Sequence, residues 1–331
     1  MAEYTKPWLS IDEQMDKLES RGVQILDRKA GSRLLAAVGH YRVTGYLYPL
    51  RESEITFDAN SRRVVQVHND YHAGTTLDYA EELVAFDRRL RMLVLEGVEH
   101  IEISLRTQVA HVLGRRSAFA HLDSANFLSS FTESITAPDS GETSAGKHEQ
   151  WIERVEDRRS ESEEAFVAHF REKYDDSMPI WALTEILELG HLGKLYSGLN
   201  SSIATEIATT YGVPTKKMLS SWISCLNYVR NVSAHHVRLF NRKLVSAPAR
   251  PSRAQVPLLG HLTEQDSAKQ TFGVYNAVAV MAYLVGLIDE KSTWAIRPVD
   301  LIDSFPASIH LNSASMGFPE GWSTFELWPR T

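Results

Sequence analysis

Apolar residues recur at helical spacing along most of the chain, which predicts a mostly α-helical protein. The clearest stretch covers residues 86–113, where apolar positions return every three or four residues and predict one long central helix. The same periodicity predicts further helices over about 148–174, 180–199, 215–242 and 265–289. The predicted fold class is therefore mostly α, a helical bundle.

Start signals place two more helices near the N-terminus. Ser10 and Glu13 fit a capping box that begins the first, and Gly22 is suited to end it. Asp27 can begin the second, which runs to about Gly39.

Between the helical stretches lie segments with other patterns. Residues 53–74 are the least helical, and 55–57 could pair with 64–67 as a small hairpin around 58–61. Residues 117–146 are loop-like, and 246–259 form a connector that contains Pro and Ser. We expect an N-terminal helical region over 1–75, a helical core over 76–245 and a C-terminal helical extension over 246–331, together forming one compact unit.

Composition is ordinary for a soluble globular protein, with 43% hydrophobic and 23% charged residues. The single cysteine, Cys225, excludes an internal disulfide and lies among apolar neighbours, so we expect a small buried hydrophobe. The N-terminus lacks the basic-then-apolar order of a signal peptide, and the longest apolar run, 272–288, is short for a membrane span. We expect a cytoplasmic protein without membrane contact.

Charge is distributed unevenly along the chain. The net charge is −7, which argues weakly against an obligate nucleic-acid binder. However, residues 133–176 hold 13 acidic and 6 basic residues, whereas residues 230–253 hold six Arg or Lys and no Asp or Glu. The second stretch could face a phosphate backbone, although an ordinary solvated face would have the same charge.

The basic stretch contains residue types suited to cutting RNA without a metal. On a continuous helix, Asn231, His235, Arg238 and Arg242 would share one face, with Arg230 beside it. Histidine can take the proton from a ribose 2′-hydroxyl or return one to the leaving oxygen, and arginine can stabilise charge on the phosphate. Asparagine can orient either group. Such chemistry leaves a cyclic phosphate and a 5′-hydroxyl, and DNA should be inert.

Spacing alone does not select this motif. Three other pairs also fit Arg-x4-His. The alternative to a catalytic role is that His235 is a structural histidine whose hydrogen-bonding groups are satisfied by neighbouring residues. The three pairs are Arg63 with His68, Arg106 with His111, and Arg116 with His121.

The surroundings of the motif carry a family resemblance. Residues 230–242 resemble the signature of AbiD/AbiF-like abortive-infection proteins, a family within the HEPN superfamily of helical ribonucleases. Other segments match that family in order, over almost the whole chain. These are residues 6–14, 41–46, 86–91, 99–102, 105–106, 179–181, 195–196 and 317–319.

The resemblance implies a HEPN-like helical bundle with N- and C-terminal additions, and RNA cleavage in phage defence. HEPN ribonucleases usually pair two such motifs across a dimer cleft, so a homodimer that binds RNA is implied. Arg230 and His235 carry over as catalytic residues with Asn231 as their polar companion. RNA-binding or supporting roles carry over, less directly, to His236, Arg238, Arg242, Glu99, Glu102 and Arg106. The last three could be a buried charge network that supports the site, or part of the site.

Other functions are weighed beside this one. The chain could be catalytically idle and bind RNA or protein as a sensor or regulatory component of a defence or toxin-antitoxin system, with a regulatory RNA or antitoxin-like partner. It could instead hydrolyse with a metal held by His68 and His72 together with the carboxylate of Asp70, although other ligands are lacking nearby in the sequence.

Two further patterns suggest no additional site. Residues 190–195 lack the spacing of a phosphate loop, and we expect no cofactor and no metal. Tyr41, Tyr46 and Tyr48 could stack on bases, but we expect them in the core.

Overall fold

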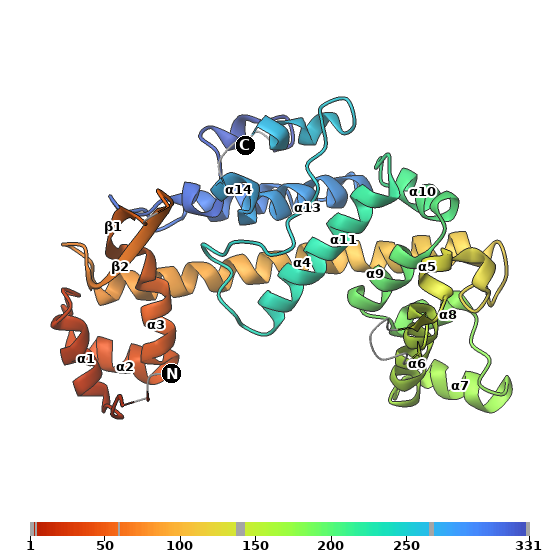
Figure 1. Ribbon diagram of the computed structural model, residues 1–331, viewed down its shortest axis with the longest axis horizontal. Helices are drawn as coiled ribbons and strands as arrows, with labels where there is room; N and C mark the ends of the chain where they lie inside the picture. Colours follow the sequence, from red (N-terminus) through yellow and green to blue (C-terminus); the bar gives the residue numbers. More distant parts are fainter. Residues whose placement is uncertain (1–2, 4, 59, 137–142, 265–267, 329–331) are drawn as a thin grey trace. The chain divides into compact units, whose positions relative to one another are not determined.

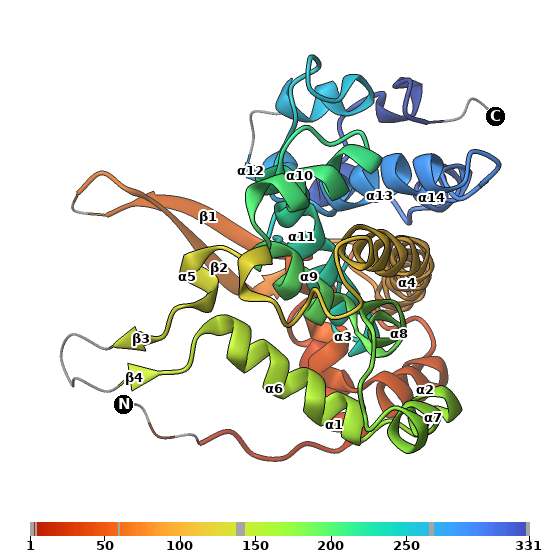
Figure 2. The ribbon, with the colours of Figure 1, turned by 90° about the vertical axis from the view of Figure 1, so that its right-hand side faces the viewer.

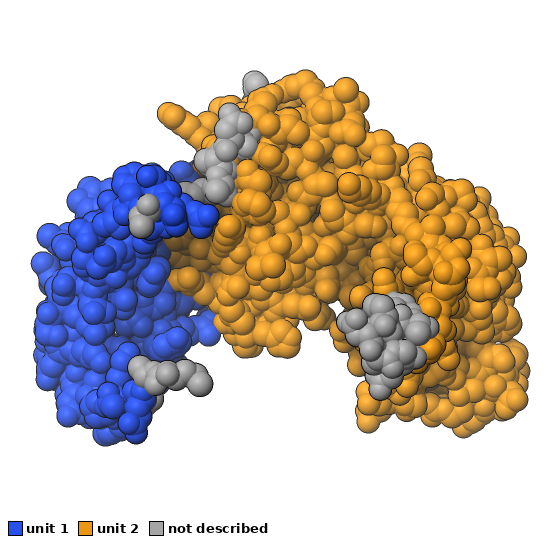
Figure 3. All heavy atoms as spheres, in the orientation of Figure 1, with its two compact units in different colours: residues 1–90, 301–315 blue, residues 91–300, 316–331 orange. Residues whose placement is uncertain are grey.

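The computed structural model describes residues 3, 5–58, 60–136, 143–264 and 268–328, and most of them are helical (Figures 1 and 2). The predicted mostly α fold class is thereby confirmed. The chain divides into two compact units (Figure 3). Unit 1 comprises residues 1–90 and 301–315, and unit 2 comprises residues 91–300 and 316–331. The sequence-based division at 75/76 and 245/246 stays a prediction.

Unit 1 begins with short helices whose start signals form as expected. The Ser10 N–H donates to the Glu13 carboxylate at 2.7 Å and the Glu13 N–H donates to Ser10 Oγ at 3.3 Å, which completes the capping box. Asp27 accepts from the N–H groups of Lys29 and Ala30. The elements are α1 (Ile11–Glu19), α2 (Arg28–Val38), α3 (His40–Leu47), a 3₁₀ turn (Tyr48–Leu50), β1 (Arg51–Phe57) and β2 (Arg63–Tyr71).

Strands β1 and β2 pair antiparallel, which confirms the hairpin predicted in this region. Of its predicted turn, Ala59 lies outside the described residues. Ile55 lies opposite Val65 in the register. Because side chains alternate between the faces of a strand, one face of the hairpin gathers exposed apolar side chains. These are Ile55, Phe57, Val65 and Val67.

The tyrosines near α3 divide between core and surface. Tyr46 is fully buried and its hydroxyl donates to the Asp87 carboxylate at 2.6 Å, so two segments of the family resemblance meet in unit 1. The expected core packing is confirmed for Tyr46. It is wrong for Tyr41, which is 92% exposed, and for Tyr48, which is 49% exposed. Tyr41 precedes the buried Val43 by two positions, which places it on the opposite side of the helix.

Helix α4 (Leu77–Gly114) is the predicted central helix, and at 38 residues it is longer than expected. It begins in unit 1 and ends in unit 2. Thr76 Oγ1 accepts from the Tyr79 N–H at 3.1 Å and so caps its first turn. Its buried stripe matches the predicted periodicity and includes Leu90, Leu93, Val94, Val98, Ile101, Leu105, Val109 and Val112.

Unit 2 contains most of the remaining helices. They are α5 (Ser129–Thr132), α6 (Lys147–Ser160), α7 (Ala165–Lys173), α8 (Ile180–Leu183), α9 (Leu189–Gly198), α10 (Ser201–Thr210), α11 (Lys216–Ala234), α12 (Ala268–Thr271), α13 (Val274–Ile288) and the first part of α14 (Ile296–Asp303). Two short strands, β3 (Ile135–Thr136) and β4 (Thr143–Ser144), pair antiparallel. Short 3₁₀ turns lie at Ser124–Asn126, Thr184–Ile186, Pro257–Glu264, Ser313–Met316 and Trp322–Thr324.

Three helices predicted as continuous are interrupted. The stretch 148–174 divides into α6 and α7, and 180–199 into α8 and α9. Of the predicted helix over 265–289, residues 265–267 lie outside the described residues, and the rest divides into α12 and α13. The break after α6 falls on residues 161–164, which carry three glutamates and no apolar side chain to pack. At α13 the helix starts anew because Gly273 is extended, with ψ at 161°. Helix α14 and the β3–β4 pair were not predicted.

The longest apolar run forms α13, which is buried on nearly all sides in unit 2. None of the helices in the described ranges combines the length and apolar character that a membrane crossing requires. Cys225 is buried as expected, and burial raises the pKa of its thiol to about 12. A thiol with so high a pKa is a poor nucleophile near neutral pH.

Two buried histidines in unit 2 should make folding sensitive to mild acid. Burial lowers the pKa of His121 and of His261 to about 4 each. Below the ordinary histidine value of about 6.5, the unfolded chain therefore binds protons that the folded chain does not. Stability should thus be full above that value and fall as the pH drops from there towards 4. Between pH 7 and pH 5 we expect each histidine to lower the free energy of unfolding by about 2 kcal/mol.

Urea unfolding at the two pH values measures this loss. His121→Asn should reduce the loss between the two pH values by about 2 kcal/mol, whereas His169→Asn, at an exposed position, should leave it unchanged. An identical pH dependence in His121→Asn and the unchanged protein would contradict the assignment.

Candidate active site at the end of helix α11

Helix α11 carries the predicted motif and is held firmly by its apolar side. Thr215 Oγ1 accepts from the Met218 N–H at 3.2 Å and caps its start. The apolar residues at helical spacing form a buried stripe, and its members are between 0% and 3% exposed: Leu219, Trp222, Ile223, Leu226 and Val229. Such burial fixes the rotation of α11 and therefore the direction in which its polar residues point.

Helix α9 approaches α11 through two glycines. A Cβ atom at Gly193 would lie 3.0 Å from Ile223 Cγ2, and one at Gly190 would lie 3.5 Å from the side chain of Asn227. Both glycines therefore serve close helix packing, and they lie within a helix. The segment 190–195 thus has a structural role here.

The predicted helix over 215–242 ends earlier, at Ala234. His235 is the C-cap, and His236 has a φ of 56°, in the left-handed region. The Val237 N–H donates to the Val232 carbonyl at 2.9 Å and the His236 N–H donates to the Ser233 carbonyl at 3.1 Å. These two bonds define a Schellman motif, the usual way to satisfy the last carbonyls of a helix.

The early end corrects the expected geometry of the site. Arg238 and Arg242 lie beyond the helix, so they do not share a helical face with Asn231 and His235. The turn at His236 directs the chain away from the helix axis, and Leu239 and Phe240 are then fully buried. Burial of these two side chains stabilises the turn over a continued helix.

The left-handed residue at the turn gives a stability prediction. A non-glycine residue in this region costs about 1 kcal/mol, and glycine avoids the clash of Cβ with the backbone. We expect His236→Gly to raise the free energy of unfolding by about 0.5–1 kcal/mol, and His236→Val to lower it by about 1–2 kcal/mol, because a branched Cβ is worst there. Urea unfolding at pH 7.5 measures both. Equal stabilities for the two variants would show that residue 236 is not left-handed.

The structure places the core of the motif around the last turns of α11. Arg230 is half-buried, and its Nη1 donates to Asn231 Oδ1 at 3.2 Å. The His235 N–H donates to the Asn231 carbonyl at 3.0 Å, and the side chains of His235 and His236 lie in solvent. Within the described residues, Arg230 and His235 form no ion pair. Arg230 therefore keeps its positive charge available for an anion.

The arginine and the histidine of one motif leave the helix at different positions around its axis. Five residues along a helix correspond to roughly 140° of rotation about its axis. Asn231 and His235 are four apart and lie on one side, whereas Arg230 lies round the helix from His235. The two side chains of one copy therefore leave α11 on different sides, although the Arg230 guanidinium extends to the side chain of Asn231.

The segment after the turn returns to α11 through Arg242. Its Nε donates to the Arg238 carbonyl at 2.8 Å, and its Nη1 donates to the Tyr228 hydroxyl at 3.2 Å. Tyr228 precedes Asn231 by three residues and His235 by seven, so it shares their side of the helix. The structure thus brings Arg242 to the site by a different route from the predicted one. Tyr228 was missed in the sequence, although this spacing could have indicated it.

The other three Arg-x4-His pairs offer no comparable arrangement. Arg116 pairs with Glu206 at 3.1 Å, and His121 is buried. Arg106 pairs with Glu102 at 2.5 Å, which occupies its charge. Arg63 and His68 lie on strand β2, where residues five apart point to opposite faces. Among the described residues, the pair at 230 and 235 alone joins an arginine free of ion pairs to an exposed histidine at a helix end.

The predicted central-helix residues behave differently from one another. Glu102 and Arg106 form an i,i+4 ion pair on α4 with side chains that are only 13% and 22% exposed. Glu99 is exposed and is not part of a buried network, which corrects that expectation. The hydrogen bonds and ion pairs of the described residues do not connect this pair to Arg230 or His235. A supporting role for Glu102 and Arg106 stays a prediction.

The histidines weighed as metal ligands are used in other contacts. His68 Nε2 lies 3.7 Å from the Glu54 carboxylate, and the ring of His72 stacks on His310 with centroids 4.2 Å apart. Across the ranges that the structure describes, there is no cluster of three or more His, Cys, Asp or Glu side chains that could hold a metal ion.

Comparison with known proteins identifies the family. The family model described as Abi-like protein matches residues 33–241, and the chain belongs to this family. The matched range contains Arg230, Asn231, His235, His236 and Arg238 and ends one residue before Arg242. Membership suggests a role in abortive infection, a defence against phage. A search of curated proteins and of solved structures finds no match.

The family match tests the family to which the chain belongs, but not its subdivision or its superfamily. The abortive-infection family is confirmed. The AbiD/AbiF subdivision and the HEPN superfamily stay predictions.

Proposed function

We propose that the protein is a metal-independent endoribonuclease of phage defence, with Arg230 and His235 as its catalytic residues. The observation that carries the proposal is the pairing of an arginine without an ion-pair partner and an exposed histidine at the end of α11. The surrounding stretch, 230–253, has six basic and no acidic residues. An RNA phosphate bound at the motif would therefore meet no repulsion from acidic side chains in this stretch.

The reaction would run within the RNA strand. The 2′-oxygen attacks the adjacent phosphorus while its proton passes to His235, acting as a general base. The bond from phosphorus to the 5′-oxygen breaks, and that oxygen takes a proton from water. Arg230 stabilises the charge that develops on the phosphoryl oxygens, and Asn231 holds the guanidinium by its 3.2 Å contact. The products are a 2′,3′-cyclic phosphate and a 5′-hydroxyl end.

A homodimer fits this chemistry better than one chain. Arg230 and His235 of one copy leave α11 on different sides, yet both must reach the same phosphate. A second copy related by a two-fold axis would supply the arginine for each histidine, which gives two equivalent composite sets. The pairing of two motifs is also what the HEPN resemblance implies.

The first experiment incubates transfer RNA and total RNA with the protein in EDTA and identifies fragment ends by mass spectrometry. Cleavage that leaves cyclic phosphates is expected. A substrate with a single 2′-deoxy position at a mapped site should resist cutting there, because the nucleophile is absent. Cutting that requires a metal would contradict the mechanism. RNA binding without any cutting would instead support the alternative, a catalytically idle sensor or regulatory component.

A further inference from the structure

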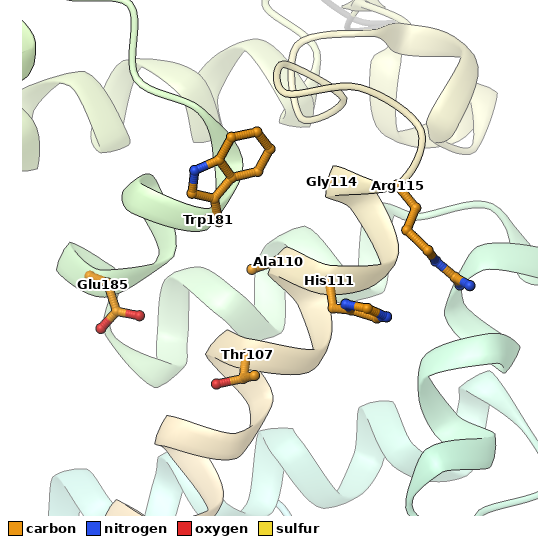
Figure 4. Close-up of a pocket in the computed structure, with 7 residues that line it drawn as sticks. All are labelled: Thr107, Ala110, His111, Gly114, Arg115, Trp181 and Glu185. Carbon is orange, nitrogen blue, oxygen red and sulfur yellow. The ribbon is translucent and has the colours of Figure 1, made fainter.

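A second feature of unit 2 combines an exposed aromatic ring with charged groups at a small cavity. Trp181, which follows the first residue of α8, is 52% exposed. It borders a cavity of about 450 Å³ over the last turns of α4 (Figure 4). A large aromatic ring that is half exposed at the edge of a cavity gains only part of the stabilisation that full burial provides. Such a ring is a candidate for contact with a ligand.

The floor of the cavity is made of small residues. Ala110 and Gly114 lie one turn apart on α4, and the ring of Trp181 packs close to this surface. A Cβ atom at Gly114 would lie 3.1 Å from Trp181 Cε3. The absence of a side chain at Gly114 therefore lets the indole lie near the helix backbone.

Charged groups of opposite sign flank this floor. Glu185 lies on the same side as Trp181, whereas His111 and Arg115 extend from the other side of α4 (Figure 4). Arg115 and Arg116 both pair with the single carboxylate of Glu206, which leaves a net positive charge of one at that end. The cavity thus offers an aromatic face, a carboxylate at one end and one unbalanced positive charge at the other.

We propose that this cavity binds a guanine base of single-stranded RNA, a specificity site that rests on the proposed ribonuclease function. A flat base stacks on an exposed indole, and single-stranded RNA is recognised by such stacking together with contacts to base edges. Guanine presents two adjacent N–H donors on its Watson–Crick edge, and the two oxygens of Glu185 accept both. Adenine, cytosine and uracil do not present this donor pair.

The charge at the other end selects a strand over a free nucleotide. One net positive charge matches a single phosphodiester of the RNA backbone. It is insufficient for the three or four negative charges of a guanosine di- or triphosphate. The exposed imidazole of His111 adds a hydrogen-bonding group for the same phosphate or its ribose.

The test measures binding, so that it remains informative if the protein cuts no RNA. Fluorescein-labelled uridine octamers that contain one central guanosine, one adenosine or neither are titrated by anisotropy into the full chain carrying His235→Ala, in EDTA. We expect the guanosine octamer to bind about tenfold tighter than the other two. Equal affinities for all three would overturn the proposal, whatever the result of the cleavage experiment.

Variants locate the site. Trp181→Ala should weaken binding of the guanosine octamer about tenfold to a hundredfold and Trp181→Phe should retain most of it, because stacking needs a ring. Trp8→Ala, at an unrelated tryptophan that is 85% exposed, should change nothing. Glu185→Gln should reduce the preference for guanosine over adenosine about tenfold. Unchanged affinity in Trp181→Ala would overturn the proposal, and so would guanosine monophosphate that competes as strongly as the octamer.

Discussion

Replacing His235 by alanine is expected to reduce the rate of RNA cleavage about a thousandfold, which is the middle of the range for loss of general acid–base catalysis. The side chain is exposed and lies at the C-cap, so its loss creates no cavity. The free energy of unfolding should therefore change by less than about 0.5 kcal/mol. A large fall in activity without a fall in stability is the signature of a group that acts in the chemistry.

Single-turnover cleavage of a defined transfer RNA measures the effect, with urea unfolding beside it. His169→Ala is a matched control, because that histidine is also exposed and lies on α7, away from the motif. Its activity should equal that of the unchanged protein. Cleavage at the normal rate by His235→Ala would remove this histidine from the mechanism, even if the protein proved to be a ribonuclease.

Mixing two inactive variants is expected to restore activity. Arg230→Ala and His235→Ala should each lose at least about a hundredfold in rate, because one lacks the charge-stabilising group and the other the proton-transfer group. In a 1:1 mixture, half of the dimers contain one copy of each. Each such dimer has one complete set of Arg230 and His235 out of the two equivalent sets of a two-fold dimer. About a quarter of the activity of the unchanged protein should therefore return.

The control for mixing is the double variant with both substitutions. When the double variant is mixed with the His235→Ala variant, neither copy of a mixed dimer has an intact His235, so no activity should return. Formation of mixed dimers is verified by co-purification of two differently tagged copies. Mixed dimers without restored cleavage would show that both groups act from the same chain, against the composite site.

The parts of the fold that the sequence predicts correctly are those decided by local signals. The capping box at Ser10, the cap at Asp27 and the stripe along α4 each depend on residues within a few turns of one another. The hairpin likewise follows from alternation over a few residues on each side of a turn. In these places local propensity and the final packing agree.

The end of α11 shows where such prediction stops. No glycine or proline lies between Pro214 and Pro248, so the sequence holds no conventional stop signal directly after Ala234. The helix ends because Leu239 and Phe240 are buried beyond the turn. That burial depends on residues distant in the sequence. It also explains why Arg242 reaches Tyr228 by a turn of the chain instead of along a helix.

The cavity beside Trp181 could not be predicted for a similar reason. Its floor belongs to α4 and its wall to α8, about seventy residues later in the chain. Helical periodicity identifies which residues of each helix are apolar, but it does not say which two helices meet. An exposed tryptophan and a glycine that lie so far apart in sequence are therefore connected only by the fold.

The adjacent histidines 235 and 236 meet unrelated physical demands, and this has a consequence for how the family should vary. At 235 the demand is for a side chain that exchanges a proton near neutral pH, which histidine alone meets among ordinary residues. At 236 the demand is for a backbone that tolerates a φ of 56°, which glycine and asparagine also meet. Across relatives, the first position should stay histidine while the second drifts among histidine, asparagine and glycine.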